Sequence, residues 1–472
     1  MVAIILLSLL GFVLVMLIIM TYYLRSVATQ FDVDDEAGLG VEKKKTGISS
    51  SQTFVYTAII LVSVAMIAAL YIYVKGTPWE AHLMEWLNII IRLMHITFGI
   101  AWIGASFYFV FLENALNRTH NVRDELAGNL WAIHGGGFYY LEKYKVAPKT
   151  IPKHLHWFKY EAYFTWLSGF CLLFVVYYFN ASALLIDKNV MDISPATGIA
   201  IGVGSFIVAW VLYDLLCKTS LVKKGIWFAL VGFIMATGFA YFYSHVFSGR
   251  AAYIHFGAMI GSIMVANVFF VIIPAQKAMV KAAREGLALN PQLGKNALSR
   301  SIHNNYFTLP VLFVMISNHF PTTFGYENPW LILIIISLGT AGVKHYLNLR
   351  EKGQLSVWVM PVSVVILLAG AFISAPPKDP GACNSKIEFS EVHAIIQARC
   401  ISCHSSSPTD DIYKAPPNGV MYDTPDDIVK KKDLIMQRVV VTKTMPQNNK
   451  TNITQKERDI IRCWIEQGAQ TK

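Results

Sequence analysis

Residues 86–112 read WLNIIIRLMHITFGIAWIGASFYFVFL, an apolar run of membrane-spanning length that carries one arginine and one histidine. A helix needs about 20 such residues to cross a bilayer, and Val, Ile and Phe do not alternate here with polar residues as in a barrel strand. Ten stretches of this kind occur, at residues 2–24, 53–74, 86–112, 161–179, 196–216, 226–247, 253–274, 306–320, 329–350 and 355–374. The sequence therefore predicts an all-α fold, with a polytopic helical membrane bundle of about ten spans over residues 1–374.

Composition agrees with a membrane protein. Of the 472 residues, 54% are hydrophobic and 15% are charged, whereas soluble domains carry roughly 25% charged residues. The formal charge of +10 is by itself compatible with nucleic acid or an anionic membrane surface as partner. However, 22 Lys or Arg lie in loops after the odd-numbered spans and only three in the loops on the other face. The positive-inside rule makes the first face cytoplasmic, so lipid and not nucleic acid is the expected partner, and residues after 374 lie outside.

The composition changes after Ser374. Residues 375–382 read APPKDPGA, a stiff polar linker, and residues 383–472 resemble a small soluble domain. Ser390 is expected to cap a helix that ends near Arg399, Thr424 to start a second helix, and a Thr454 capping box to open a third. A core of this size usually needs an additional constraint.

Cys400, Cys403 and His404 form a C-x-x-C-H motif, the signature of covalent c-type haem attachment. Two thiols at this spacing can reach the two haem vinyl groups, and the histidine supplies the proximal iron ligand. Alternatively, the two cysteines could belong to a zinc or redox segment that matches the motif by chance. That interpretation gives no role to His404. Met445, which precedes a proline, is the best candidate for the sixth iron ligand. Two further methionines compete for this role, Met421 and Met436.

Four cysteines remain outside this motif. Cys383 precedes the first helix of the C-terminal domain and Cys463 lies in the last. On the oxidising side of a membrane we expect them to form a disulfide, the alternative being two free thiols. Cys171 and Cys217 belong to the membrane part and are expected to be inert small hydrophobes.

Six residues in and directly after the span at 86–112 share one helix face, because they recur at intervals of three, four or seven residues. They are Arg92, His95, Gly99, Trp102, Ser106 and Glu113. An unpaired charge inside a span costs a few kcal/mol, roughly 2.5–3.5 by insertion scales, so this face is expected to point into the bundle. An arginine one turn from a histidine favours a redox or anion site over a histidine that merely hydrogen-bonds in the core.

Histidines of the membrane part fall at different predicted depths. Paired histidines on facing helices are a common way to hold b-type haem. We therefore hypothesise a non-covalent haem b with His95 and His255 as its ligands. The alternative is that histidines near span ends hydrogen-bond at the level of the lipid headgroups.

The segment from Glu113 to Tyr160 is long, basic and aromatic. Gly135, Gly136 and Gly137 follow His134, and consecutive glycines permit a close backbone approach to a flat ligand. The alternative is an amphipathic surface loop. No Walker-type loop, catalytic-triad order or dinucleotide fingerprint occurs in the sequence.

Three blocks of the membrane part carry a family resemblance: MHITFGIAWIG at residues 94–104, HGGGFY at 134–139 and LHWFKYEAYFTWLSG at 155–169. Followed by a C-x-x-C-H domain, they resemble the bacterial membrane-bound urate hydroxylases, which are urate oxidases fused to a cytochrome c. The resemblance covers nearly the whole chain. The first block alone also resembles haem-binding membrane proteins of the protoporphyrinogen oxidase and copper-resistance type.

The resemblance implies oxidation of urate to 5-hydroxyisourate, a step of purine catabolism, at the bacterial inner membrane with the cytochrome c domain in the periplasm. Electrons would leave through the C-terminal haem to a respiratory acceptor, a cytochrome or an oxidase. Urate is a planar anion, so Arg92 could bind it, and His134 or Glu113 could act as the base.

The side of the membrane on which urate binds stays open at this point. From a cytoplasmic site, electrons would cross about 30 Å of hydrocarbon, which requires an intramembrane cofactor, whereas an outer site requires none. Two other classes of function also fit the sequence. One is an electron conduit from quinol to a periplasmic carrier without substrate oxidation, and the other is a haem-handling or transport protein with a tethered cytochrome.

Overall fold

The computed structural model describes residues 69, 72–75, 77–148, 150–152, 155–375, 383 and 385–471. Its contacts divide the chain into two compact units, Met1–Leu87 with Pro152–His156, and Asn88–Ile151 with Trp157–Lys472. The predicted span 2–24, most of the span 53–74 and most of the linker 375–382 lie outside the described residues. The second unit contains every site discussed below.

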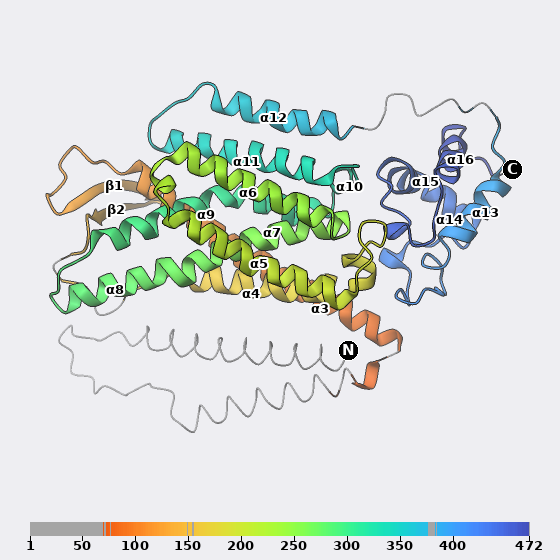
Figure 1. The fold of residues 1–472 in the computed structure, drawn as a ribbon, viewed down its shortest axis with the longest axis horizontal. Coiled ribbons are helices and arrows are strands. Elements are labelled where there is room, and N and C mark those ends of the chain that lie inside the picture. Colours follow the sequence, from red (N-terminus) through yellow and green to blue (C-terminus); the bar gives the residue numbers. More distant parts are fainter. Residues whose placement is uncertain are drawn as a thin grey trace. The chain divides into compact units, whose positions relative to one another are not determined.

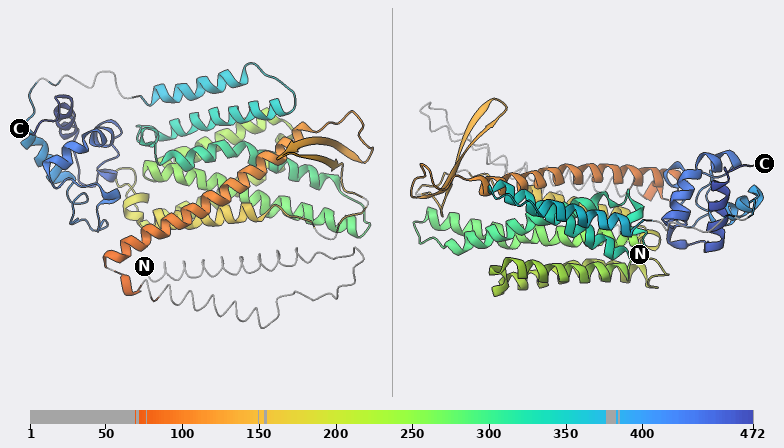
Figure 2. Two further views of the ribbon diagram at one scale, coloured as in Figure 1. Left: turned by 180° about the vertical axis from the view of Figure 1, so that it is seen from behind. Right: turned by 90° about the horizontal axis from the view of Figure 1, so that it is seen from above.

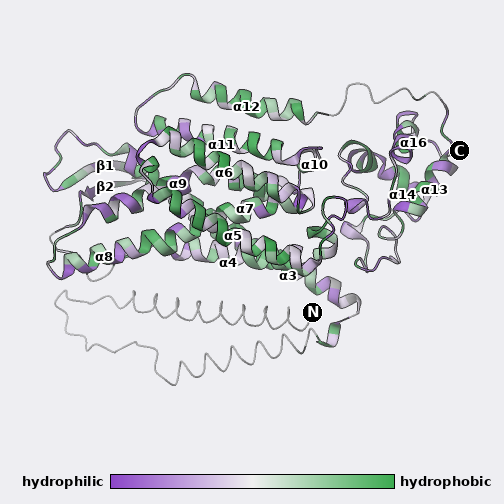
Figure 3. Ribbon diagram, viewed as in Figure 1, coloured by the Kyte–Doolittle hydropathy of each residue, from purple (hydrophilic) through white to green (hydrophobic). Residues whose placement is uncertain are grey.

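Ten helices make up the described membrane part (Figure 1). They are α3 Pro78–Ala115, α4 Tyr160–Leu173, α5 Pro195–Lys218, α6 Gly225–Ser244, α7 Gly249–Ala266, α8 Ile273–Arg284, α9 Pro291–Ser317, α10 Pro321–Phe324, α11 Pro329–Glu351 and α12 Val359–Ile373. Figure 3 shows that α11 and α12, which pack side by side, are predominantly hydrophobic.

Six helical segments among the described residues are long and apolar enough to cross a membrane, as expected of a membrane protein. These segments are His82–Ala115, Tyr160–Tyr178, Pro195–Lys218, Gly225–Ser244, Gly249–Arg284 and Pro329–Glu351. The predicted span 355–374 forms α12, which is apolar but shorter. The short predicted span 306–320 is the apolar second half of α9, a helix of 27 residues whose first half is polar.

Three π-helical segments interrupt or extend these helices. Phe174–Tyr178 (η1) continues α4, Ala181–Leu185 (η2) follows it, and Asn267–Ile272 (η4) joins α7 to α8. Such π turns are rare in proteins, and those that occur often lie at functional sites. The main core lies among η1, η2 and α5 to α7, and its fully buried side chains include Tyr243 and Tyr253.

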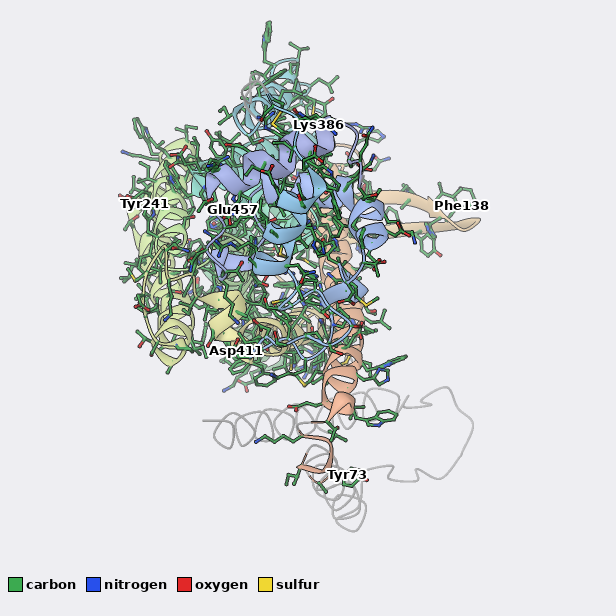
Figure 4. The ribbon with its side chains drawn as sticks, turned by 90° about the vertical axis from the view of Figure 1, so that its right-hand side faces the viewer. Tyr73, Phe138, Tyr241, Lys386, Asp411 and Glu457 are labelled. Atoms are coloured by element: carbon green, nitrogen blue, oxygen red, sulfur yellow. A yellow bond between two sulfur atoms is a disulfide. The ribbon has the colours of Figure 1, made fainter. Side chains whose placement is uncertain are left out.

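A β-hairpin follows α3, so the prediction of an all-α fold is wrong in this segment. Strands β1 (Leu126–His134) and β2 (Gly137–Tyr144) pair antiparallel, with His134 opposite Gly137. The connecting Gly135 and Gly136 have φ values of 56° and 80°, and a two-residue turn with positive φ at both positions is the turn that matches strand twist. Figure 2 shows the hairpin projecting from the neighbouring helices, and Figure 4 shows exposed Phe138 at its tip. The glycines therefore serve a turn.

Four helices form the C-terminal domain: α13 Phe389–Arg399, α14 Pro425–Lys430, α15 Lys432–Ile435 and α16 Gln455–Glu466. The π-helical segment Met436–Val441 (η6) and two short 3-10 turns, Pro417–Gly419 and Gln447–Asn449, connect them. The helix start at Thr424 and the capping box at Thr454 are confirmed, and Thr424 forms a capping box as well. The prediction for Ser390 is wrong, because α13 begins at Phe389 after the N-cap Glu388.

The core of this domain is small and closed by a covalent link. Val392, Ile428, Ile461 and Trp464 are almost completely buried in it. The disulfide between Cys383 and Cys463 is present, as predicted, and joins the segment before α13 to α16. The constraint expected for so small a core is therefore supplied in part by this bond.

Candidate functional site

The C-x-x-C-H motif lies directly at the end of α13. Cys400 is the C-cap of that helix, and its carbonyl oxygen accepts hydrogen bonds from the backbone N–H groups of Cys403 (3.2 Å) and His404 (2.9 Å). His404 Nδ1 lies 3.0 Å from the Val420 carbonyl oxygen. When Nδ1 donates to that oxygen, Nε2 is left as the nitrogen that could bind iron. Burial lowers the pKa of His404, against the effect of this hydrogen bond, and so favours the neutral imidazole that iron requires.

Met445 is held by its backbone on two sides. Its N–H donates to the Arg438 carbonyl oxygen (3.0 Å), and its own carbonyl oxygen accepts from Arg458 Nη1 (2.8 Å). It lines one cavity of about 1410 Å³ together with Cys400, Cys403 and His404. Neither of the two competing methionines lines this cavity. Two thiols, an imidazole and a thioether around one space fit a covalently attached haem.

This cavity is larger than the roughly 300–1,000 Å³ of a typical small-molecule pocket. Residues of the membrane part form the rest of its wall, among them Arg92, Ser248 and Asn318. A haem would therefore leave part of the space for a second ligand. No group of three or more His, Cys, Asp or Glu is placed to hold a bare metal ion anywhere in the described part of the chain.

Asp410 braces the loop that follows the motif. Its carboxylate accepts hydrogen bonds from Lys450 Nζ (2.6 Å) and from the backbone N–H groups of Ile412 (2.8 Å) and Tyr413 (3.0 Å). Burial alone would raise the pKa of Asp410, but these bonds outweigh burial and lower it to about 2. The ionised carboxylate thus ties this loop to the segment before α16.

We expect the C-terminal domain to lose stability as the pH falls from about 4 towards 2. Because the folded pKa of Asp410 lies below its ordinary value of 3.8, its contribution is complete above pH 4 and is lost on protonation. Thermal unfolding of the full chain in detergent between pH 5 and pH 2 measures this, and Asp410→Asn should flatten the pH dependence. Asp411→Asn is the matched control, since Asp411 also pairs with Lys450 but is 76% exposed. Equal pH profiles for the two variants would contradict the prediction.

Arg92 and His95 lie where α3 faces the bundle. Arg92 is half-buried, and its Nη2 donates to Asn88 Oδ1 (3.1 Å). His95 Nδ1 lies 3.0 Å from the Thr165 carbonyl oxygen and 3.2 Å from Ser168 Oγ, both on α4. Gly169 makes room for this ring, because a Cβ there would lie 2.8 Å from His95 Cε1.

His255 has different surroundings from His95. It is completely buried, with Nδ1 2.8 Å from the Ala251 carbonyl oxygen and Nε2 3.1 Å from the Tyr178 hydroxyl. A Cβ on Gly202 of α5 would lie 2.9 Å from Nε2. The two histidines share no hydrogen-bond partner among the described residues, and His255 Nε2 faces a hydroxyl. The haem b hypothesis stays a prediction, and no step below depends on it.

Glu113 and His134 lie away from Arg92. Glu113 is near the other end of α3, 21 residues and about 31 Å further along the helix at 1.5 Å per residue. It pairs with Arg118 at 3.0 Å and with Lys143 of the hairpin. His134 is exposed next to the hairpin turn. The three residues proposed for catalysis therefore do not form one site.

A buried polar network went unnoticed in the sequence. Arg300 of α9 pairs with Asp214 (2.6 Å), and its Nη1 donates to Asn267 Oδ1 (3.1 Å) in the π-helical segment η4. Asn267 Nδ2 in turn donates to Tyr213 Oη (3.1 Å) and Asn304 Oδ1 (2.8 Å). Asn267 could have indicated this network from the sequence, since it is a polar residue inside the predicted span 253–274.

Comparison with known proteins gives one finding. A family model described as urate oxidase N-terminal matches residues 81–375, whereas no curated protein and no solved structure matches the chain. The matched region runs from α3 through α12 and ends before the C-x-x-C-H domain. It covers more than half of the sequence, so the chain belongs to the urate oxidase N-terminal family.

Proposed function

We propose that the protein oxidises urate to 5-hydroxyisourate and passes the electrons to a haem on its own C-terminal domain. Urate monoanion and one water give the 5-hydroxyisourate anion, two protons and two electrons. The observation that carries the proposal is the single cavity lined both by the C-x-x-C-H motif and by the family-matched membrane part. A haem bound there would supply a one-electron acceptor, from which electrons leave to a respiratory cytochrome or oxidase.

Contacts between the C-terminal domain and the membrane part support this arrangement. Gln447 Nε2 donates to the Ala183 carbonyl oxygen (2.7 Å), and Asn448 Nδ2 donates to the carbonyl oxygens of Ala183 (2.8 Å) and Ile186 (2.7 Å). Gly325 lies against Thr442, because a Cβ on it would be 2.5 Å from the Thr442 oxygen. Both contacted loops belong to the face predicted to lie outside, which supports an inner-membrane protein with a periplasmic C-terminal domain.

An outer site also simplifies the path of the electrons. Arg92 and the C-x-x-C-H motif line the same cavity, so electrons from a urate bound there need not cross the hydrocarbon layer. A cytoplasmic site would require a second cofactor to span about 30 Å. The geometry therefore favours substrate oxidation on the outer side.

We expect urate to reduce the haem of the purified full chain under anaerobic conditions. Two haems should be reduced for each urate consumed, because the reaction releases two electrons and each haem accepts one. Visible absorption follows the haem, and ultraviolet absorption follows urate and 5-hydroxyisourate. If the haem stays oxidised with urate but is reduced by a quinol, the protein is an electron conduit and the proposal fails.

A further inference from the structure

Three arginines outside the C-x-x-C-H motif and its loop line the same cavity. Arg92 comes from α3, Arg250 from the start of α7 and Arg438 from the C-terminal domain. All three are half-buried, and none forms an ion pair with a carboxylate within the described residues. Burial, and then the charge of Arg250, lowers the pKa of Arg438. Three half-buried cations without a carboxylate partner are a site for an anion.

The rest of the lining leaves this positive charge uncompensated. Seven Lys or Arg side chains line the cavity, against three Asp side chains. Asp411 pairs with Lys450, and Asp192 lies 3.7 Å from Lys188. An anionic ligand would therefore gain charge-assisted hydrogen bonds without displacing an existing partner.

The position of Arg250 is fixed by two neighbours. Its Nε donates to Asn318 Oδ1 (3.0 Å), and its guanidinium carbon lies 5.9 Å from the centre of the Tyr177 ring. The Tyr177 hydroxyl donates to the same Asn318 oxygen (3.2 Å). Arg92, Arg250 and Asn318 all line the cavity, whereas the Tyr177 ring is buried and packs on Arg250. Two guanidinium groups and one amide thus face one space, and groups of this kind recognise a planar anion.

The arginine group also lies close to the haem attachment site. Tyr413 lines the same cavity as Arg250 and Cys403, and its hydroxyl donates to Gln447 Oε1 (2.6 Å). The backbone of Arg438 also accepts the hydrogen bond from the N–H of Met445 (3.0 Å). This proximity suits a donor site for the haem.

We propose that Arg92, Arg250 and Asn318 bind the urate monoanion in the cavity that the C-x-x-C-H motif also lines. This inference rests on the proposed function and adds to it the place and the residues of substrate binding. Arg438 closes the site from the C-terminal domain. The haem propionates are the other anions that these arginines could bind, and the experiment below separates the two.

Binding can be measured without turnover. With the haem reduced beforehand by excess dithionite, urate has no acceptor for its electrons, and equilibrium dialysis of radiolabelled urate against the full-length holoprotein reports affinity alone. Arg92→Gln and Arg250→Gln should each weaken binding at least about tenfold, the loss expected for a hydrogen bond to a charged group. Arg250→Lys keeps the charge and should fall between wild type and Arg250→Gln. Arg123→Gln, an exposed arginine before β1 that pairs with Glu142 of the hairpin, is the matched control and should bind urate as wild type does.

Each other outcome overturns the assignment. If the variants lose haem or shift its midpoint potential while urate affinity is unchanged, the arginines bind the haem propionates. If wild type binds urate and urate reduces its haem, but the variants bind as wild type does, the site lies elsewhere and the proposed function survives. If wild type neither binds urate nor is reduced by it, the site and the proposed function both fail. Should Arg250→Gln not fold, Arg250→Lys and Arg92→Gln decide the question.

Discussion

Replacing Cys400 and Cys403 together by serine is expected to remove the covalently bound haem and to lower urate oxidation to the detection limit. Both thiols line the cavity that His404 and Met445 share, and a serine hydroxyl does not form the thioether links of a c-type haem. Haem staining of a denaturing gel reports the covalent link, and loss of urate absorption reports activity. Both signals should disappear in the double variant.

The two free cysteines of the membrane part provide the matched control. Cys171→Ser in α4 and Cys217→Ser in α5 make the same replacement of sulfur by oxygen. Both variants should retain the stained haem. Covalent haem in the double variant at Cys400 and Cys403 would contradict the assignment of the motif. The membrane fraction of that variant also tests haem b, since a remaining haem spectrum would support a non-covalent site at His95 and His255, and its absence would exclude one.

Replacing Arg300 by methionine is expected to destabilise the bundle by about 3–5 kcal/mol, the cost of breaking a buried ion pair. Only 8% of the Arg300 side chain is exposed, and its guanidinium lies 2.6 Å from Asp214 and 3.1 Å from Asn267 Oδ1. Without the guanidinium, Asn267 Oδ1 loses the hydrogen bond that Arg300 Nη1 donates. The Asp214 carboxylate then keeps only its ion pair with the exposed Lys218. Thermal or urea unfolding in detergent, with and without the substitution, measures the change.

Lys218 offers a control on the same carboxylate. Its Nζ lies 2.6 Å from Asp214 Oδ2, but its side chain is 69% exposed, so Lys218→Met should cost only about 0–1 kcal/mol. Equal losses for the two variants would mean that burial does not decide the strength of these pairs, against the argument made for Arg300.

Features of the C-terminal domain were predictable because their signals are local in sequence. The Thr424 and Thr454 capping boxes each join residues three positions apart. The hairpin was predictable in principle, since Gly135 and Gly136 stand between two aromatic segments, but the neighbouring His134 directed the interpretation to a ligand. A turn and a ligand-binding loop both need glycine, and only strand pairing distinguishes them.

The arrangement of the candidate site was less predictable. Arg92 could be singled out because a charge inside a span is costly, but Arg250 and Asn318 lie on other elements more than 150 residues away in sequence. Glu113 was grouped with Arg92 because both lie on one face of one helix. A shared face does not mean a shared depth, and the rise along α3 separates the two by about 31 Å.

The hydrogen bonds from Gln447 and Asn448 to the carbonyl oxygens at residues 183 and 186 have a kinetic consequence. Because both partners belong to one polypeptide, docking is intramolecular, and tethered partners face each other at an effective concentration in the millimolar range. The proposed transfer of electrons from urate to the C-terminal haem would then be a first-order process whose rate does not change on dilution. A freely diffusing cytochrome at micromolar concentration would compete poorly for that surface and would meet the protein only after the first transfer.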